Sequence, residues 1–513
     1  MGATPWRVLA DARTTPEAAG VSSQAIRAFL AAVAGSTHEM HSLMIMRHGQ
    51  PIVQGWWRPY RADTPQSLYS LSKSFTSTAV GLAVTEGKLK VTDRVVDFFP
   101  ERKPSSVSDN LNALRVQHLL TMAVGHAKDP TAAITREEDW VRAFLAFPIE
   151  NAPGSAFVYN SGATYMLSAI LQKVTGEKLI DYLRPRLFDP LQVSGMRWAT
   201  CPRGIDTGGW GLSATTETLA KFGQLYLQQG QWNGKQLVPR AWVQEATTAK
   251  IQQPATTPGT DLAQLKQSSD WHQGYAYQFW RCRHDAFRGD GAFGQYCIVL
   301  PKQDAVIAIT SATPNMQALL NLVWEHLLPG LQDKPLSADA SASSQLQEQL
   351  AALTLPLPSG SPTSPTSARI NGRTFELESN SLGAKSVAVR FAGDSCKFEL
   401  TTAAGRFDIN CGIGRWVDGA TSMPGTPPEI SEMIGPPVGA QSAAKVGAAG
   451  AWTDPNTFQM QWRFYGTPHH DVVTCRFDND RVQVEFKNSI TALGGTHPET
   501  RPVLKGHAFV ANG

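Results

Sequence analysis

The sequence contains no apolar run near the roughly 20 residues that a membrane-spanning helix requires, so we expect no membrane span. It also contains no long basic run, and 46 Lys and Arg against 43 Asp and Glu leave a net charge of only +3. This balance argues against nucleic acid as the main partner. Residues 1–6 lack the basic and apolar regions of a secretory signal. A periplasmic or secreted location stays open if a signal has been removed.

Metal-binding and redox motifs are also missing. The six cysteines are scattered, without a Cys-x-x-Cys pair or a His-Glu-x-x-His sequence, so we expect no zinc site. We expect buried free thiols and a chain that works without a cofactor. Cys282 and Cys297 flank a predicted hairpin and could lie close together, but the sequence leaves their pairing open.

Two further signatures are absent or incomplete. The sequence has no Gly-x-Ser-x-Gly motif, which disfavours an α/β-hydrolase with a Ser-His-Asp triad. Gly289, Gly291 and Gly294 satisfy Gly-x-Gly-x-x-Gly spacing. A strand rather than a helix is predicted to follow them, which leaves no helix N-terminus for a pyrophosphate. We therefore reject a dinucleotide site.

What the sequence does contain indicates two domains. Its 513 residues are too many for one ordinary core, and 42% hydrophobic with 17% charged residues is typical of globular proteins. Ser, Pro and Ala dominate residues 332–368, as in a linker. We predict a large domain over residues 1–331 and a smaller β-rich domain over 369–513, an antiparallel barrel or sandwich.

Hydrophobic periodicity predicts an α/β (α+β) fold for the large domain. A hairpin is predicted within residues 42–57, and after a helical middle part the strands return before a final helix. The predicted helices are 74–86, 116–122, 164–175, 216–228 and 317–328, and the later strands are 275–281, 295–300 and 305–310. This order predicts a sheet layer with a helical subdomain and a cleft between them.

The first candidate site is the tetrad Ser70-Leu71-Ser72-Lys73, which opens an apolar, helix-like run. Residues three apart share a helix face, so the Lys73 ammonium can reach the Ser70 hydroxyl. Lysine ordinarily titrates near ~10.4, so a base role requires burial that lowers its pKa. Ser442 and Lys445 have the same spacing but lie in a Gly/Ala/Pro-rich stretch, so we choose Ser70 as nucleophile. The alternative is a plain helix N-terminus with a solvated lysine.

The second candidate is the triplet Tyr159-Asn160-Ser161, which precedes a predicted helix. A phenol beside a lysine can act as acid or base, and a short polar side chain two residues on can hold the lysine or orient substrate. The alternative is a tyrosine beside a helix cap.

The third candidate is the glycine-rich segment over residues 288–295, which leads into the apolar strand YCIVLP. Glycines before a strand allow close approach of a substrate to the backbone. Such an edge can present a backbone N–H to a developing oxyanion, together with the N–H of Ser70.

The conspicuous tryptophans are expected to fill the core or line a cleft, and the histidines to pack or to bond loops, rather than to take part in the reaction. Tryptophans more often fill cores or line clefts than carry reactions. This expectation applies to Trp56, Trp57, Trp210, Trp280, His118 and His126.

The segments YSLSKSFTS, FVYNSGATYMLSAILQKVTG and RGDGAFGQYCIVLP, in this order, resemble the serine β-lactamase and penicillin-binding-protein superfamily. The resemblance covers residues 15–330 and is to the class C and family VIII carboxylesterase branch. It implies that Ser70 is acylated, that Lys73 activates it and that Tyr159 relays protons. It also implies an oxyanion hole formed by the backbone N–H groups of Ser70 and Ala292.

Two departures from this family's pattern bear on substrate. Ser161 stands where the family has asparagine, and Gly289 stands where β-lactamases have the lysine that meets the antibiotic's carboxylate. Loss of that charge-assisted contact is expected to weaken carboxylate-bearing β-lactams by about 2 kcal/mol, unless Arg283 or Arg288 substitutes. The residues expected to contact substrate are Asn160, Ser161, Gly289, Asp290 and Gly291.

We therefore expect a cofactor-free hydrolase that acts on a small-molecule carboxylic ester. Amide hydrolysis, as in the 6-aminohexanoate-oligomer hydrolases and D-stereospecific aminopeptidases that the branch includes, and weak β-lactamase activity remain alternatives. A non-catalytic binding protein on the same fold is a further alternative. The natural substrate, the role of the C-terminal domain and assembly into a homo-oligomer are left open.

Overall fold

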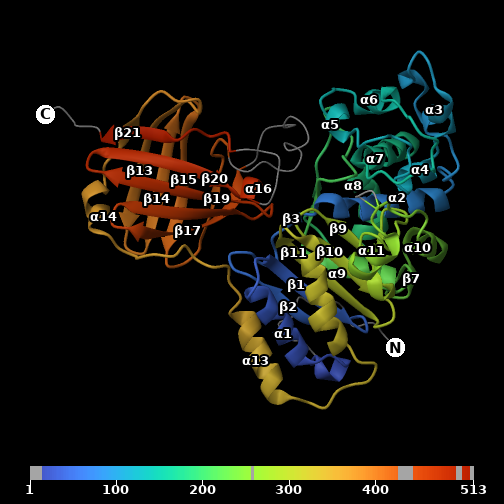
Figure 1. Cartoon of the computed structure of the whole chain (residues 1–513), viewed down its shortest axis with the longest axis horizontal. Helices are drawn as coiled ribbons and strands as arrows, with labels where there is room; N and C mark the ends of the chain where they lie inside the picture. Colours follow the sequence, from blue (N-terminus) through green and yellow to red (C-terminus); the bar gives the residue numbers. More distant parts are fainter. Residues whose placement is uncertain (1–13, 256–258, 426–442, 493–498, 509–513) are drawn as a thin grey trace. The chain divides into compact units, whose positions relative to one another are not determined.

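The computed structural model describes residues 14–255, 259–425, 443–492 and 499–508 (Figure 1). The chain divides into two compact units. The described part of the first unit consists of residues 14–56 and 67–352, apart from the gap at 256–258. The second unit includes residues 57–66 as well as the described residues from 353 onward.

The first unit contains a six-stranded antiparallel sheet in the order β2-β1-β11-β10-β9-β8. Its strands are β1 (Glu39–Arg47), β2 (Gln50–Trp56), β8 (Trp280–Arg281), β9 (Phe287–Gly291), β10 (Gln295–Leu300) and β11 (Ala305–Ala312). Every residue of β9, β10 and β11 is buried, as expected for strands covered on both faces. The hairpin predicted at residues 42–57 is the β1–β2 pair.

One predicted strand is largely wrong. Of residues 275–281, only Trp280–Arg281 form a strand. Gln278 has a positive φ of 65°, and the N–H of Ala276 donates to the carbonyl of Phe279, so the chain turns there. Apolar and aromatic composition alone could not show this reversal.

Helices cover this sheet and form a subdomain beside it. The helix α9 (Thr216–Leu227) packs on β1, β10 and β11, and α2 (Ser72–Thr85) packs on α7 (Ser161–Thr175). Figure 1 shows α3 to α7 gathered at one end of the unit. The other α-helices of this part are α3 (Asp109–Ala113), α4 (Val116–Leu120), α5 (Thr131–Ile134), α6 (Trp140–Ala146), α8 (Leu179–Leu183), α10 (Arg240–Thr247) and α11 (Leu262–Ser268).

Short strands and late helices complete the unit. A three-stranded sheet joins β3 (Gln66–Ser67), β5 (Leu212–Ala214) and β4 (Arg197–Trp198), and a separate pair joins β6 (Gln231–Trp232) and β7 (Lys235–Gln236). The final predicted helix appears as α12 (Met316–Leu322) followed by a π-helical turn, η7 (Val323–Leu327).

The segment predicted as a linker, residues 332–368, contains regular structure. It includes α13 (Ala340–Ala351), which packs on α1 (Ser23–Ala34), and the start of α14 (Pro365–Ile370). The division between the compact units falls at residue 353, within this segment.

The second unit is an antiparallel β-barrel of nine strands closed by one parallel pairing, between β15 and β17. The strand β16 (Val417–Thr421) adds to β17 outside the ring. The ring strands are β12 (Phe375–Leu377), β13 (Ala384–Ala392), β14 (Ser395–Thr402), β15 (Gly405–Ile413), β17 (Ala444–Asp454), β18 (Thr457–Phe464), β19 (His470–Asp478), β20 (Arg481–Asn488) and β21 (Leu504–Ala508). Their alternating apolar residues form a core that includes Phe398, Trp452 and Trp462. The short helix α16 (Ser489–Ala492) follows β20.

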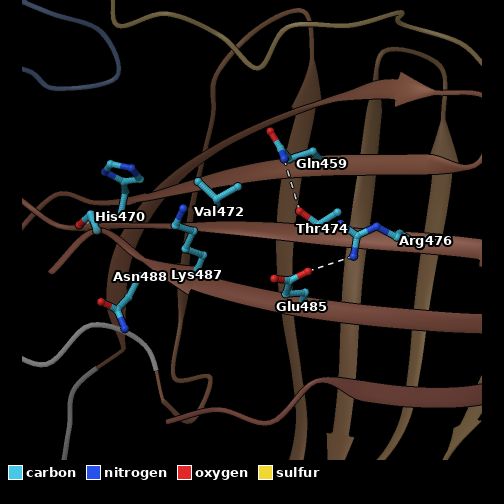
Figure 2. A pocket seen from close by; sticks show the side chains of 9 residues that line it. Gln459, His470, Val472, Thr474, Arg476, Glu485, Lys487 and Asn488 are labelled. Carbon is cyan, nitrogen blue, oxygen red and sulfur yellow. Dashed lines mark hydrogen bonds and ion pairs between the residues drawn. The ribbon is translucent and has the colours of Figure 1, made fainter. Parts of the chain in front are cut away.

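A polar pocket of about 350 Å³ lies on β18, β19 and β20 (Figure 2). Its wall includes the ion pair between Arg476 and Glu485, 2.9 Å apart, and the side chain of His470. The residues that line it alternate with the core residues Val473, Cys475 and Val484, so they belong to the other face of these strands.

All six cysteines are buried free thiols, so Cys282 and Cys297 are not paired. The Cys297 thiol donates to the carbonyl of Leu219 at 3.3 Å, and Cys282 accepts from Arg288 at 3.0 Å. Among the residues that the structure describes, no helix is both long enough and apolar enough to cross a membrane.

Candidate active site

Ser70 lies in a tight turn at the start of α2. The 3-10 turn η2 (Tyr69–Leu71) runs directly into α2, and Tyr69 adopts a positive φ of 51°, which is unusual for a bulky residue. The turn is tied to β5, because the N–H of Leu68 donates to the carbonyl of Leu212 at 2.8 Å. Ser70 itself is partly exposed. This arrangement fixes the serine backbone while leaving its side chain accessible.

Lys73 is buried beneath the serine, with 2% of its surface exposed. Its Nζ lies 3.0 Å from Ser70 Oγ, 3.0 Å from Ser161 Oγ and 2.7 Å from the carbonyl oxygen of Gly209. The helical spacing predicts the first of these contacts. The second comes from the start of α7, where Ser161 is the first helical residue.

Burial lowers the pKa of Lys73 from 10.5 to about 7, while the carboxylates of Asp129 and Asp290 act in the opposite direction. A large part of this lysine is therefore neutral near neutral pH. The lysine can then accept the Ser70 proton, as a general base for the nucleophile must.

Tyr159 lies beside Ser70 and Lys73. Its ring centroid lies 4.8 Å from Lys73 Nζ, and its hydroxyl takes part in a hydrogen bond with Ser70. Burial raises the pKa of the phenol far above its usual value, so the hydroxyl keeps its proton. The ring stacks on Trp280, with centroids 5.9 Å apart and an interplanar angle of 15°. Trp280, expected to fill the core or line a cleft, lies against Tyr159 at this site.

Asn160 lies beside the reactive group but turns away from it. Its side chain is fully buried, accepts a hydrogen bond from the N–H of Ala163 at 2.9 Å and donates to His126 at 3.0 Å. It therefore caps α7 and anchors the loop that carries His126. The Asn160 amide is thus taken up by structural contacts, and its expected contact with substrate stays a prediction.

The glycine-rich strand β9 packs closely against the turn that carries Ser70. A Cβ atom on Gly291 would lie 2.0 Å from the carbonyl oxygen of Leu68, and one on Gly289 would lie 2.7 Å from Ser74 Oγ. Both glycines are therefore needed for close backbone approach, and Gly289 faces α2. Ala292, which follows Gly291, is partly exposed.

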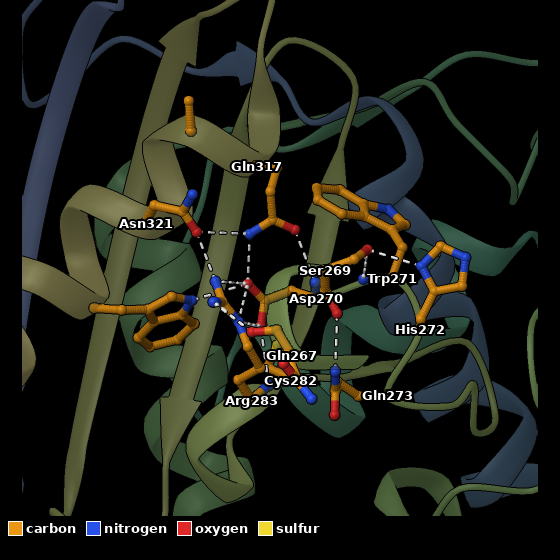
Figure 3. Close-up of polar contacts among 12 residues, drawn as sticks. Gln267, Ser269, Asp270, Trp271, His272, Gln273, Cys282, Arg283, Gln317 and Asn321 are labelled. Carbon is orange, nitrogen blue, oxygen red and sulfur yellow. Dashed lines mark hydrogen bonds and ion pairs between the residues drawn. The ribbon is translucent and has the colours of Figure 1, made fainter. Parts of the chain in front are cut away.

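The other face of β9 carries a buried ion pair. Arg288 is fully buried, and its Nε and Nη2 both lie 2.9 Å from Asp290 Oδ2. Arg283 is also engaged, because its guanidinium contacts the Asp270 carboxylate at 2.9 Å and Asn321 at 2.6 Å (Figure 3). Neither arginine points a free guanidinium toward Ser70.

Several of these contacts were not identified from the sequence. The Gly209 carbonyl, the Trp280 ring and the Arg288–Asp290 pair come from segments far from Ser70 along the chain. The only sequence signal for Gly209 is that it lies in a glycine-rich stretch. The structure gives the reason for a glycine there, because a Cβ on Gly209 would lie 2.8 Å from the Ser161 carbonyl oxygen.

The second Ser-x-x-Lys match is only partly described by the structure. Ser442 lies outside the described residues, and Lys445 is exposed on the strand β17. Within the described ranges, no three His, Cys, Asp or Glu side chains form a group that could hold a metal ion.

Comparison with known proteins identifies the family. The sequence profile of the Beta-lactamase family matches residues 24–326, and the chain belongs to this family. The family comprises serine hydrolases with the α/β fold found here.

Individual relatives are distant. The 6-aminohexanoate-dimer hydrolase of Paenarthrobacter ureafaciens is 24% identical over 293 residues, which cover 53% of this chain and 73% of that protein. A Beta-lactamase of Escherichia coli is 22% identical over 317 residues, which cover 56% of this chain and 76% of that protein. Among solved structures, the octameric penicillin-binding protein homologue from Pyrococcus abyssi is 16% identical with a TM-score of 0.47, covering 94% of this chain and 99% of that chain.

Proposed function

We propose that this serine hydrolase cleaves carboxylic esters through an acyl-enzyme formed on Ser70. The observation that carries the proposal is the contact of one buried lysine with two hydroxyls, 3.0 Å to Ser70 Oγ and 3.0 Å to Ser161 Oγ. A neutral amine at this position activates the serine without a histidine or a metal.

The reaction takes two steps. Lys73 accepts the Ser70 proton as Oγ attacks the ester carbonyl. As the tetrahedral intermediate collapses, the Tyr159 hydroxyl gives its proton to the leaving alkoxide and regains one from Lys73, so that both groups return to their starting states. In the second step, Lys73 takes a proton from the attacking water, and Tyr159 and Lys73 deliver a proton to Ser70 Oγ as the acyl bond breaks. The high pKa of Tyr159 suits a relay that keeps its proton between steps.

The oxyanion of both intermediates is proposed to bind the backbone N–H groups of Ser70 and Ala292. The close packing of Gly291 on the carbonyl of Leu68 supports this role, because it holds the end of β9 next to the turn that carries Ser70. Fixed donors of this kind stabilise negative charge that develops during attack.

The charges around the site favour substrates without a carboxylate near the scissile bond. The two arginines that could replace the missing lysine are both bound to carboxylates, Arg288 to Asp290 and Arg283 to Asp270. Asp290 and Asp129 instead add negative charge that acts on Lys73. A β-lactam carboxylate would therefore find no unpaired guanidinium among these residues, whereas a neutral ester needs none.

Amide hydrolysis is the second candidate. It is favoured by the similarity of this chain to a 6-aminohexanoate-dimer hydrolase, because the match covers 73% of the length of that enzyme. The same groups would serve, with Tyr159 giving its proton to a leaving amine.

Parallel hydrolysis assays test the proposal. Wild type, Ser70→Ala and the matched control Ser442→Ala are compared on p-nitrophenyl butyrate, nitrocefin and a D-alanyl p-nitroanilide. We expect turnover of the butyrate ester that Ser70→Ala abolishes and Ser442→Ala leaves unchanged. Anilide turnover would favour the amidase and nitrocefin turnover a β-lactamase. No turnover of any substrate, or turnover independent of Ser70, would contradict the proposal and favour a binding protein.

A further inference from the structure

The ring of Tyr159 is the first member of a connected series of stacked groups. Its neighbour Trp280 is parallel to it within 15°, and the guanidinium carbon of Arg288 lies 5.8 Å from the Trp280 ring. The same guanidinium lies 4.4 Å from the ring of Trp271. Arg288 thus joins two tryptophans, one of which contacts the proposed proton relay.

Arg288 is held from several sides. Its Nη1 donates to the carbonyl oxygen of Asp270 at 2.9 Å and to Cys282 Sγ at 3.0 Å, while Asp290 takes the opposite edge of the guanidinium. A guanidinium with such contacts has one orientation, because its donors form a planar fork.

The acceptor residue Asp270 is itself the centre of a network (Figure 3). Its carboxylate accepts hydrogen bonds from Arg283, from Gln317 Nε2 at 2.7 Å and from Trp324 Nε1 at 2.9 Å. The network fixes the loop that carries Asp270 and Trp271 to α12 and the turn after it. Arg288 is therefore anchored to a rigid part of the unit rather than to a surface loop.

Asp290 links Arg288 to Trp280 a second time. Its carboxylate pairs with Arg288 and takes part in a hydrogen bond with the Trp280 side chain. Arg288 therefore restrains Trp280 in two ways, through the ring face and through the carboxylate that binds its side chain.

We propose that Arg288 is a positioning residue that, through Trp280, holds the Tyr159 hydroxyl where it can protonate the leaving group. The inference rests on the proposed acyl-enzyme function and adds to it a residue that touches neither substrate nor Ser70. A shift of about 1 Å in a reacting group can cost roughly 100-fold in rate, so a rigid support for Tyr159 has a measurable effect.

The test exploits the different needs of two leaving groups. p-Nitrophenolate leaves without a proton, whereas the ethoxide of ethyl butyrate requires one as it leaves. The two substrates share the butyryl group, and kcat/KM covers only the steps through acylation. We expect Arg288→Met to lower kcat/KM for ethyl butyrate about 100-fold and to change that for p-nitrophenyl butyrate much less. Tyr159→Phe should give the same selective loss.

Controls separate positioning from folding. Arg186 also lies over an aromatic ring, 3.9 Å from that of Tyr182, and pairs with a carboxylate, that of Glu86 at 2.8 Å. Arg186→Met therefore removes the same two kinds of contact outside the site and serves as the control. It should leave both substrates unaffected. If Arg288→Met does not fold, Trp280→Leu provides the same test, and Trp280→Phe, which keeps a stacking ring, should retain most of the ethyl butyrate activity.

Equal losses on both esters, or no loss on either, in folded Arg288→Met or Trp280→Leu would overturn the inference. If Tyr159→Phe shows the selective loss and these variants do not, the proposed function stands and Arg288 has no positioning role. If wild-type turnover does not require Ser70, the proposed function itself fails, and the assay with Ser70→Ala shows this independently.

Discussion

The low pKa of Lys73 makes a quantitative prediction about pH. With a pKa of about 7, the lysine is about nine-tenths neutral at pH 8, whereas at its ordinary value only about one molecule in 300 would be neutral. If neutral Lys73 takes the Ser70 proton, kcat/KM should rise with pH to a plateau, with a midpoint close to 7.

The assay is the pH profile of kcat/KM on p-nitrophenyl butyrate, followed at the isosbestic wavelength of the phenol. Asp129 supplies the perturbation, because its carboxylate raises the Lys73 pKa and its side chain is exposed. Asp129→Asn should therefore move the midpoint to lower pH. A limb that rises only near the ordinary lysine pKa, or a midpoint that moves upward in Asp129→Asn, would refute the reasoning.

The same pKa has a consequence for stability. Between about 7 and 10.5 the unfolded chain binds a proton at Lys73 that the folded chain does not. The free energy of unfolding therefore rises with pH across this window through this group. Lys73→Met removes that contribution, so the difference in unfolding free energy between variant and wild type should change with pH in chemical denaturation curves.

Three further substitutions give separate tests. Ser161→Ala removes a 3.0 Å partner of the lysine and should lower kcat/KM about tenfold, since one charge-assisted hydrogen bond is worth roughly 1.5 kcal/mol or more; unchanged activity would contradict its role. Gly291→Ala places a Cβ 2.0 Å from the Leu68 carbonyl oxygen and should cost on the order of 100-fold in kcat by displacing an oxyanion donor, measured in protein shown to be folded by circular dichroism. Gly81→Ala places a Cβ 2.3 Å from the ring of Trp242 and should destabilise the fold by about 1–3 kcal/mol, which a denaturation midpoint would reveal or disprove.

Local spacing was enough to predict the central contact of the site. Ser70 and Lys73 are three residues apart at a helix start, and geometry within one helical turn depends little on the rest of the fold. The hairpin of β1 and β2 and the strand β10 were predictable for the same reason, because alternation and turn residues are local features.

Contacts that depend on distant segments could not be predicted this way. Asn160 and Ser161 are neighbours, yet one caps α7 and the other meets Lys73, a difference set by the backbone at the helix start. The stacking of Trp280 on Tyr159 depends on the turn at Gln278, which no pattern in the sequence announces. The sequence shows that Arg288 and Asp290 alternate with glycines on β9. It does not show that the two charged side chains pair with each other.

The division of the chain has a consequence for attempts to separate the units. Residues 57–66 belong to the second unit although the last of them, Gln66, is the first residue of β3 and Ser70 follows shortly after it in the chain. Within that unit, Arg61 pairs with Asp418 at 2.8 Å and the ring of Tyr60 meets that of Tyr465. A chain shortened after Ala352 would keep residues 57–66 but lose Asp418 and Tyr465, which they contact. Trimming the barrel from the C-terminus alone would therefore leave the ring of Tyr60 without its partner a few residues ahead of Ser70, so a clean separation also has to replace the part of residues 57–66 that belongs to the barrel.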